Sequence, residues 1–377
     1  MVRFNFFIIL LFGVAFMATG VGPGRQNPYP VVTTVKDGVK IITNPDYPLD
    51  GRFTGKLTEE MSCGEEATPE SAMLNRPFDL RIDDQGRIYV MDAGDVHFKV
   101  YDERGIFLRA IGRKGQGPGE LAGLVLFELT TDGKICALDD LQRRVTILST
   151  DGQYLYSFPL QGSHRGLDVD GQNRLYLGKF SPVEEPKLST EFREVPCVTS
   201  IFRADASGKE MVHMADILGE SLVEKAMSGD SVMTLGGPYS VIWAVSRRGK
   251  LYGGCNETFR LNAYGTDGKL EFTFVREFTP LKNPRYAGRV GQKKTMPAFK
   301  RAIVFDEKEN LWLELSKEEK TKGFTYDVFS PEGIYLKQVK IDQLIFQFKN
   351  GKVYSIVRPA DGYPSVKRFQ LELVPQK

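Results

Sequence analysis

Short runs of alternating apolar and polar residues recur along the chain, and tight polar turns join them in pairs. Residues 78–83 read FDLRID and residues 87–92 read RIYVMD, with the turn DQG between them. Residues 98–102 (FKVYD) and 106–112 (IFLRAIG) repeat this arrangement. Alternation with a period of two predicts β-strands, and glycine favours the positive φ of tight hairpin turns. The pattern therefore predicts four consecutive antiparallel strands in this part of the chain.

The same polar turn, followed by a short apolar strand, occurs six times. Each of these strands opens with a basic or amide residue, an aliphatic residue, and then an aromatic residue or cysteine: Arg87-Ile88-Tyr89, Lys134-Ile135-Cys136, Arg174-Leu175-Tyr176, Lys250-Leu251-Tyr252, Asn310-Leu311-Trp312 and Lys352-Val353-Tyr354. A repeat of about 40 residues or more suits the blade of a propeller. The sequence therefore predicts an all-β fold, a six-bladed β-propeller of four-stranded antiparallel blades.

The first repeat resembles a known family. Residues 76–121 (RPFDLRIDDQGRIYVMDAGDVHFKVYDERGIFLRAIGRKGQGPGEL) are similar to one unit of the NHL-repeat six-bladed β-propellers. Asp95-Val96-His97 stand where that family has the tripeptide that names it. The resemblance implies that GRKGQGPGE (112–120) links the outermost strand of one blade to the innermost strand of the next. The alternative, a phosphate-binding loop, is disfavoured because Pro118 and Gly119 stand where a P-loop has lysine and a hydroxyl residue.

The two ends of the chain are expected to close the ring. Residues 56–66 (KLTEEMSCGEE) resemble the outer strand and linker of the first unit, yet no blade precedes them. We expect residues 56–63 to complete the sixth blade by pairing with the strand at 366–373, because a closed ring leaves few exposed strand edges. The expected organisation is a signal peptide (1–20), an N-terminal extension with a short hairpin (21–55) and the propeller (56–377).

The N-terminal segment indicates export. Arg3 precedes an apolar run from Phe6 to Met17, and the small residues Ala18 and Gly20 follow it. This arrangement is typical of a secretory signal peptide, and an uncleaved anchor is the alternative. The expected location is periplasmic or extracellular, without stable membrane insertion after cleavage. The net charge of +2 over 377 residues, together with export, disfavours nucleic acid as a partner.

The long connections are expected on one side of the disc. They are residues 181–196, 219–238 and 279–301, and binding residues often lie on such loops. Arginine suits carboxylate, phosphate or sulfate groups, and aromatic rings can stack on a sugar or base. The candidate ligand-binding residues on this face are Arg76, Arg165, Tyr239, Arg285, Tyr286, Arg289, Lys293, Lys294, Lys300 and Arg301. The alternative is a solvated basic loop that the glutamates of 181–196 neutralise.

Catalysis is the less favoured interpretation. Aligning the repeats predicts an inner-strand row that contains Arg81, Glu128, Asp168, Ala244, Val304 and Phe346. This row does not form a ring of metal ligands, no C-x-x-C pair is present, and the three histidines suit structural or solvent-facing roles. No cofactor is expected. The sequence favours a recognition or scaffold module for an unknown protein, peptide or anionic glycan. The alternative is a propeller hydrolase or lyase acting on a small or sugar-derived substrate.

Overall fold

The structure is a computed structural model of the chain. It describes residues 30–65, 70–123, 125–184, 193–205, 208, 211–226, 232–236, 239–287, 293–300, 303–360 and 362–376. The signal peptide expected at residues 1–20 lies outside this range. None of the helices in the described ranges is long and apolar enough to cross a membrane.

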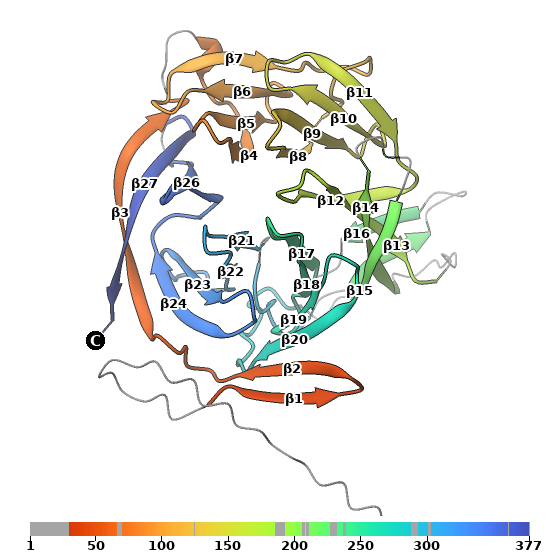
Figure 1. Ribbon diagram of the computed structural model, residues 1–377, viewed down its shortest axis with the longest axis vertical. Coiled ribbons are helices and arrows are strands. Elements are labelled where there is room, and N and C mark those ends of the chain that lie inside the picture. The colour runs from red at the N-terminus through yellow and green to blue at the C-terminus, as the bar shows by residue number, and fades with distance from the viewer. Residues whose placement is uncertain are drawn as a thin grey trace, which may run out of the picture.

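Five sheets surround a central axis, as Figure 1 shows, and the eight-stranded one comprises two blades. This confirms the predicted six-bladed β-propeller. In the first two blades four strands follow one another from the axis to the rim: β4 (Pro77–Ile82), β5 (Ile88–Asp92), β6 (His97–Tyr101) and β7 (Phe107–Ile111), then β8 (Leu126–Leu129), β9 (Lys134–Asp139), β10 (Arg144–Ser149) and β11 (Tyr154–Pro159). One short 3-10 helix, η1 (Glu70–Ala72), precedes β4.

The next two blades carry additional strands. Blade 3 has five strands: β12 (Ser163–Val169), β13 (Leu175–Pro182), β14 (Arg193–Ala204), β15 (Met211–Ala226) and β16 (Val232–Gly236). Blade 4 consists of β17 (Val241–Val245), β18 (Leu251–Cys255), β19 (Arg260–Tyr264) and β20 (Leu270–Arg276), and its outer edge is extended by the hairpin of β1 (Val32–Lys36) and β2 (Val39–Asn44). Strand β2 runs parallel to β20.

The N-terminal strand closes the ring as predicted. Blade 5 consists of β21 (Val304–Phe305), β22 (Leu311–Glu314), β23 (Phe324–Phe329) and β24 (Tyr335–Ile341), and blade 6 of β25 (Gln347–Lys349), β26 (Lys352–Val357), β27 (Ser365–Pro375) and β3 (Arg52–Cys63). Strand β3 pairs with β27 from Cys63 opposite Val366 to Phe53 opposite Pro375. Its first residues also pair in parallel with β24, so β3 joins blades 5 and 6.

The repeated polar turn has a common physical cause. Asp83, Asp170 and Asp306 each end an inner strand or directly follow it. Each carboxylate accepts hydrogen bonds from the backbone N–H groups two and four residues later, at 2.9 to 3.0 Å. An aspartate that bonds its own backbone in this way stabilises a tight turn. Because these hydrogen bonds join residues close together in the sequence, the turns can be predicted from the sequence alone.

The hydrophobic core is divided among the spaces between neighbouring blades. Phe98 of blade 1, for example, packs on Phe127 of blade 2 with ring centroids 4.8 Å apart. Phe259 and Phe274 of blade 4 pack on Phe329 of blade 5 in the same manner. Because each blade is buried on both faces by its neighbours, the strands carry apolar residues on both faces. Inner-strand side chains that face the axis do not pack between blades, so they can line a ligand-binding cavity.

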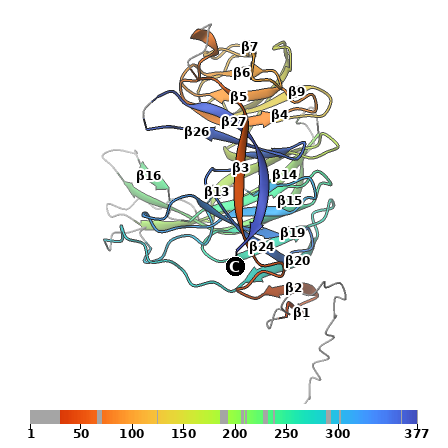
Figure 2. The same cartoon turned by 90° about the vertical axis from the view of Figure 1, so that its left-hand side faces the viewer.

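Part of the expected long loops is strand. We expected residues 181–196 and 219–238 to be loops, but β14 and β15 continue beyond the blade, and β16 pairs with the end of β15. Residues 222–226 (LVEKA) and 232–236 (VMTLG) pair with each other, so these backbone segments find hydrogen-bonding partners within the extension. Figure 2 shows β16 projecting from one side of the disc.

Candidate functional site

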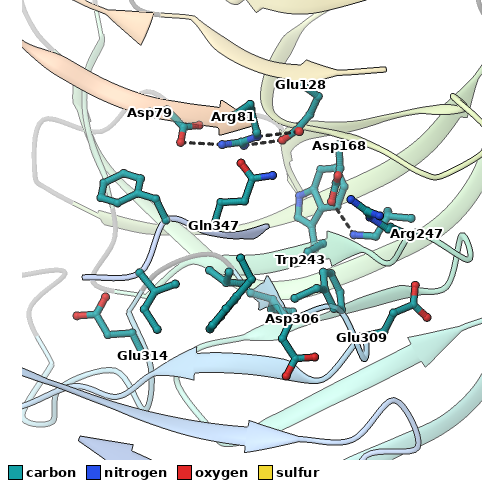
Figure 3. Close-up of a pocket in the computed structure, with 18 of the residues that line it drawn as sticks. Asp79, Arg81, Glu128, Asp168, Trp243, Arg247, Asp306, Glu309, Glu314 and Gln347 are labelled. Carbon is teal, nitrogen blue, oxygen red and sulfur yellow. Dashed lines mark hydrogen bonds and ion pairs between the residues drawn. The ribbon is translucent and has the colours of Figure 1, made fainter. Parts of the chain in front are cut away.

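Inner-strand residues of all six blades line one cavity of about 470 Å³ on the axis of the ring. This volume is within the range of small-molecule sites. The lining residues that the argument below uses are Asp79, Arg81, Glu128, Asp168, Trp243, Arg247, Glu309 and Gln347, and Figure 3 shows them around the cavity. Leucine, isoleucine, valine and phenylalanine side chains line most of the rest, among them Leu126, Leu167, Phe305 and Phe346.

Arg81 joins two carboxylates on the wall formed by blades 1 and 2. Its guanidinium donates to Asp79 at 2.8 Å and to both oxygens of Glu128, with the Nε to Oε2 bond at 2.7 Å. The same guanidinium lies over the ring of Phe127. Burial raises the pKa of Glu128, and the charge of Arg81 opposes this shift. The arginine is thus fully engaged by protein groups.

Asp168 lies on the wall formed by blades 3 and 4 and has different partners. Its Oδ1 accepts the backbone N–H of Val169 at 2.7 Å, and its Oδ2 accepts the N–H of Val245 at 2.6 Å. Burial and the nearby charge of Glu128 raise the pKa of Asp168 to about 8, although the two backbone donors oppose the shift. A carboxyl group with such a pKa exchanges its proton near neutral pH.

Trp243 of β17 lies in a slot formed by glycines of blade 3. A Cβ on Gly166 would lie 2.4 Å from Cζ2 of Trp243, and a Cβ on Gly178 would lie 2.9 Å from the same atom. Gly166 and Gly178 face each other in the pairing of β12 with β13. No side chain larger than glycine fits at these positions without a shift of the indole. The slot holds the indole against β12 at Gly166, which lies two residues before Asp168 on that strand.

Gln347 connects the cavity across the junction where the ring closes. Its Oε1 accepts the backbone N–H of Ile82 at 2.8 Å, so β25 of blade 6 is bonded to β4 of blade 1.

At the turn side of the cavity, Glu309 accepts from the backbone N–H of Arg248 at 3.1 Å, and its carboxylate lies 3.2 Å from that arginine's Nε. Arg247 is exposed at the same end.

The residues predicted for the long-loop face divide into exposed and buried groups. Arg76, Arg165, Arg285, Tyr286, Lys294 and Lys300 are exposed, and Lys293 is half-buried. We expected the ring of Tyr239 to be available to a ligand. Instead Tyr239 is buried, with its hydroxyl 2.9 Å from Oγ1 of Thr295. Arg289 and Arg301 lie outside the described residues. The guanidinium of Arg165 lies over the ring of Phe180 at 3.7 Å from the centroid.

Two ion pairs tie the basic loop to its neighbours. Lys293 lies 3.1 Å from Glu194 at the start of β14, and Glu194 raises the pKa of this lysine. Arg285 donates through Nε and Nη2 to Glu319 of the connection between β22 and β23. The basic loop is therefore partly neutralised by a glutamate of the 181–196 segment, which was the alternative considered from the sequence.

Histidines and cysteines lie away from the cavity wall described above. Burial lowers the pKa of His97 and of His164, and His213 lies 2.9 Å from Asp216 at the surface. None of the four cysteines forms a disulfide in the part of the chain that the structure describes, and burial raises the pKa of Cys63 and Cys136 to about 12. Among the described residues, no group of three or more histidine, cysteine or acidic side chains has a geometry that could hold a metal ion.

Comparison with family models agrees with the fold. The model of the family DUF5128, described as a 6-bladed beta-propeller, matches residues 67–182, which is less than half of the chain. No curated protein is detectably similar to the sequence.

Solved structures show the same architecture at low identity. A Bacteroides fragilis protein described as exported is 14% identical, with a TM-score of 0.54, and the match covers 89% of this chain and 100% of that one. A DUF4221 family member from Bacteroides vulgatus is 11% identical, with a TM-score of 0.53 and coverage of 86% and 99%. Likenesses of this degree show fold and not activity. The chain is a six-bladed β-propeller.

Proposed function

We propose that the protein is an exported recognition module, similar in kind to NHL-repeat propellers, that binds its partner on the long-loop face. The closed ring supplies a rigid base, because β3 bonds to β27 over almost its whole length. Binding residues held by a rigid scaffold lose little conformational entropy when a ligand binds. The described fold thus meets the main physical requirement of a recognition surface.

The observation that carries the proposal is the connection between the two insertions. The extension of β14, β15 and β16 projects on the side of the disc from which the basic loop also rises. Glu194 of the extension and Lys293 of the loop form an ion pair, and Glu319 of blade 5 holds Arg285. Two ion pairs therefore link the extension of blade 3, the basic loop and blade 5.

The ligand class follows from the charges that remain on this surface. Lys294 and Lys300 are exposed, and neither forms an ion pair with another described residue. The exposed ring of Tyr286 lies next to Arg285 in the chain. Cations beside an aromatic ring suit an anionic glycan or an acidic peptide.

A hydrolase or lyase is the second candidate because of one residue. Asp168 lies in the axial cavity with a pKa of about 8, which suits a general base near neutral pH. A small or sugar-derived substrate would fit a cavity of about 470 Å³. Recognition remains the favoured function, because the described cavity residues include no serine, threonine, cysteine or lysine that an adjacent base could activate.

Binding to an array of sulfated glycans and acidic peptides at two salt concentrations tests the proposal. We expect binding that weakens at high salt and falls at least several-fold in the double variant Lys294→Ala/Lys300→Ala. The matched control is Lys269→Ala/Lys308→Ala, which removes two exposed lysines from the turns on the opposite side of the disc. Equal losses in both double variants would show a nonspecific charge effect and would reject the long-loop face.

A further inference from the structure

The axial cavity has the features of a second ligand site, separate from the long-loop face. We propose that it binds an organic ammonium ion, with Asp168 pairing with the cationic group and Trp243 covering it. The proposal does not depend on the function assigned to the long-loop face, since the inner strands and not the insertions supply these residues.

The first argument is the charge balance of the cavity wall. The inner strands contribute Asp79, Glu128 and Asp168 to the described lining, and Arg81 is the single basic residue that they contribute. The guanidinium of Arg81 is occupied by Asp79 and Glu128. Asp168 forms no ion pair with another described residue and is bonded by backbone N–H groups. Asp168 is half-buried, and a carboxylate with little access to water and no cation beside it is costly, so a positively charged ligand beside Asp168 would be stabilised.

The second argument is the position of the indole. Gly166 lies two residues before Asp168 on β12, so the two positions lie on the same face of the strand. The indole of Trp243 lies so close to Gly166 that a side chain on this glycine would collide with it. Oδ2 of Asp168 accepts a hydrogen bond from the backbone N–H of Val245, which lies two residues after Trp243 on β17. The indole and the carboxyl group are therefore neighbours, as Figure 3 shows. Tryptophan is the aromatic residue that attracts cations most strongly.

The third argument concerns what kind of cation fits. Calcium and magnesium take six or more oxygen ligands, but the described residues hold no group of three carboxylates or other ligands able to bind a metal. The rest of the cavity is lined largely by apolar side chains, including Phe78, Leu167 and Phe346. A cavity of about 470 Å³ with a carboxyl group that has no ion-pair partner among the described residues and with largely apolar walls suits an ammonium group on an apolar body.

Proton release is expected to accompany binding. The charged groups that face Asp168 or share its cavity are Glu128, Arg81 and Asp79 from blades 1 and 2, Arg247 from blade 4, and Asp306, Glu307, Glu309 and Glu314 from blade 5. With a pKa of about 8, Asp168 is mostly protonated at pH 7 in the free protein. Because the ammonium ion pairs with the ionised form, its binding must displace that proton.

Three probes of nearly the same shape test the charge preference. Isothermal titration calorimetry would compare 2-phenylethylammonium with 2-phenylethanol and with phenylacetate on the intact protein. We expect the ammonium ion to bind at least tenfold more tightly than the alcohol and phenylacetate to bind most weakly. Undetectable binding of the ammonium ion, or equal binding of the three probes, would overturn the proposal.

Asp168→Asn tests the residue. We expect at least a tenfold loss of 2-phenylethylammonium affinity and little change for 2-phenylethanol. Asp132→Asn makes the same substitution at an exposed turn that does not line the cavity, and it should leave both affinities unchanged. Equal losses in the two variants, or no loss in Asp168→Asn, would remove Asp168 from the site.

The pH dependence of the unmodified protein gives a test that needs no variant. Benzyltrimethylammonium carries a permanent charge, so any pH dependence of its binding belongs to the protein. We expect its affinity to rise between pH 6 and pH 8 and to level off above the pKa of Asp168. Calorimetry in buffers of different ionisation enthalpy should show the release of close to one proton at pH 6. An affinity that is constant over this range would contradict pairing with Asp168.

Discussion

The two walls of the axial cavity carry carboxyl groups at equivalent positions but with different partners. Glu128 on β8 and Asp168 on β12 occupy the same place in neighbouring blades and line the same cavity. Glu128 accepts hydrogen bonds from Nε and Nη2 of Arg81, whereas Asp168 accepts hydrogen bonds only from backbone N–H groups. Burial raises the pKa of both, but Glu128 has a cation that opposes the shift and Asp168 has a nearby carboxylate that increases it.

This difference gives the two walls different roles. The charges of the first wall are paired within the protein, whereas the second wall has a carboxyl group that can pair with a ligand. On the wall of blades 1 and 2, Arg81 connects adjacent inner strands through Asp79 and Glu128, so its charges are satisfied within the protein. On the wall of blades 3 and 4, the glycine slot fixes Trp243 beside a carboxyl group that lacks a cation. A buried ion pair is lost at high cost when one partner is removed, whereas an uncompensated carboxyl group can respond to a ligand or to pH.

Removing the cation from the first wall should have the largest effect on stability. Arg81→Met leaves Asp79 and Glu128 facing each other in the cavity without a positive charge. We expect the free energy of unfolding to fall by about 3 kcal/mol, the lower end of the range for breaking one side of a buried pair, because the three side chains are half-buried. Urea unfolding at pH 7, followed by circular dichroism, measures it.

Arg87→Met provides the control for this prediction. Arg87 pairs with Asp83 at 2.6 Å in a turn near the surface, so we expect a loss of no more than about 1 kcal/mol. If Arg81→Met cost as little as Arg87→Met, the first wall would not be held by its charges and the contrast with the second wall would disappear.

The sequence predicted most of the fold because its signals are local. The aspartate turns at 83, 170 and 306 bond to their own backbone, so the hairpins could be recognised without knowledge of distant contacts. Ring closure was also predicted, because residues 56–63 have the pattern of an outer strand without a blade before them. The extension of β14 and β15 was not predicted, since a strand that continues beyond its blade is stabilised by a partner distant in sequence.

The site was harder to predict, because it depends on which blades are neighbours across the axis. The inner-strand row correctly grouped Arg81, Glu128 and Asp168, and the charges on three consecutive blades were the available signal. That row was tested only as a ring of metal ligands, which it does not form, and so the pairing of Arg81 was missed. Trp243 was missed because the reason for its position lies in Gly166 and Gly178, whose small size has meaning only once blades 3 and 4 face each other.

Asp168→Asn should change the pH dependence of stability by the next largest amount. The pKa of Asp168 is about 8 in the folded protein and near 4 in an unfolded chain. Between these values the folded protein retains a proton that the unfolded chain has lost, so stability falls as pH rises. We expect the wild-type protein to lose up to about 1.4 kcal/mol per pH unit relative to Asp168→Asn between pH 5 and pH 8.

Urea unfolding of both proteins at four pH values in this range isolates the contribution. Every other titrating group is common to the two proteins, so the difference between their slopes belongs to Asp168. Parallel curves would mean that Asp168 is ionised in the folded state and that the second wall resembles the first.

Gly166→Ala should have the smallest of these effects and tests the slot directly. The added Cβ would lie 2.4 Å from Cζ2 of Trp243, so the indole or β12 must move. Gly166 has no positive φ, which makes the change a test of space alone. We expect a loss of about 1 to 3 kcal/mol, the usual range for overpacking, with a changed near-ultraviolet circular dichroism signal of tryptophan. Gly123→Ala is the matched control, because its Cβ would meet only the end of the exposed Leu141 side chain. An effect no larger than that of the control would mean that the indole is free to move, and Trp243 would then lose its fixed place beside Asp168.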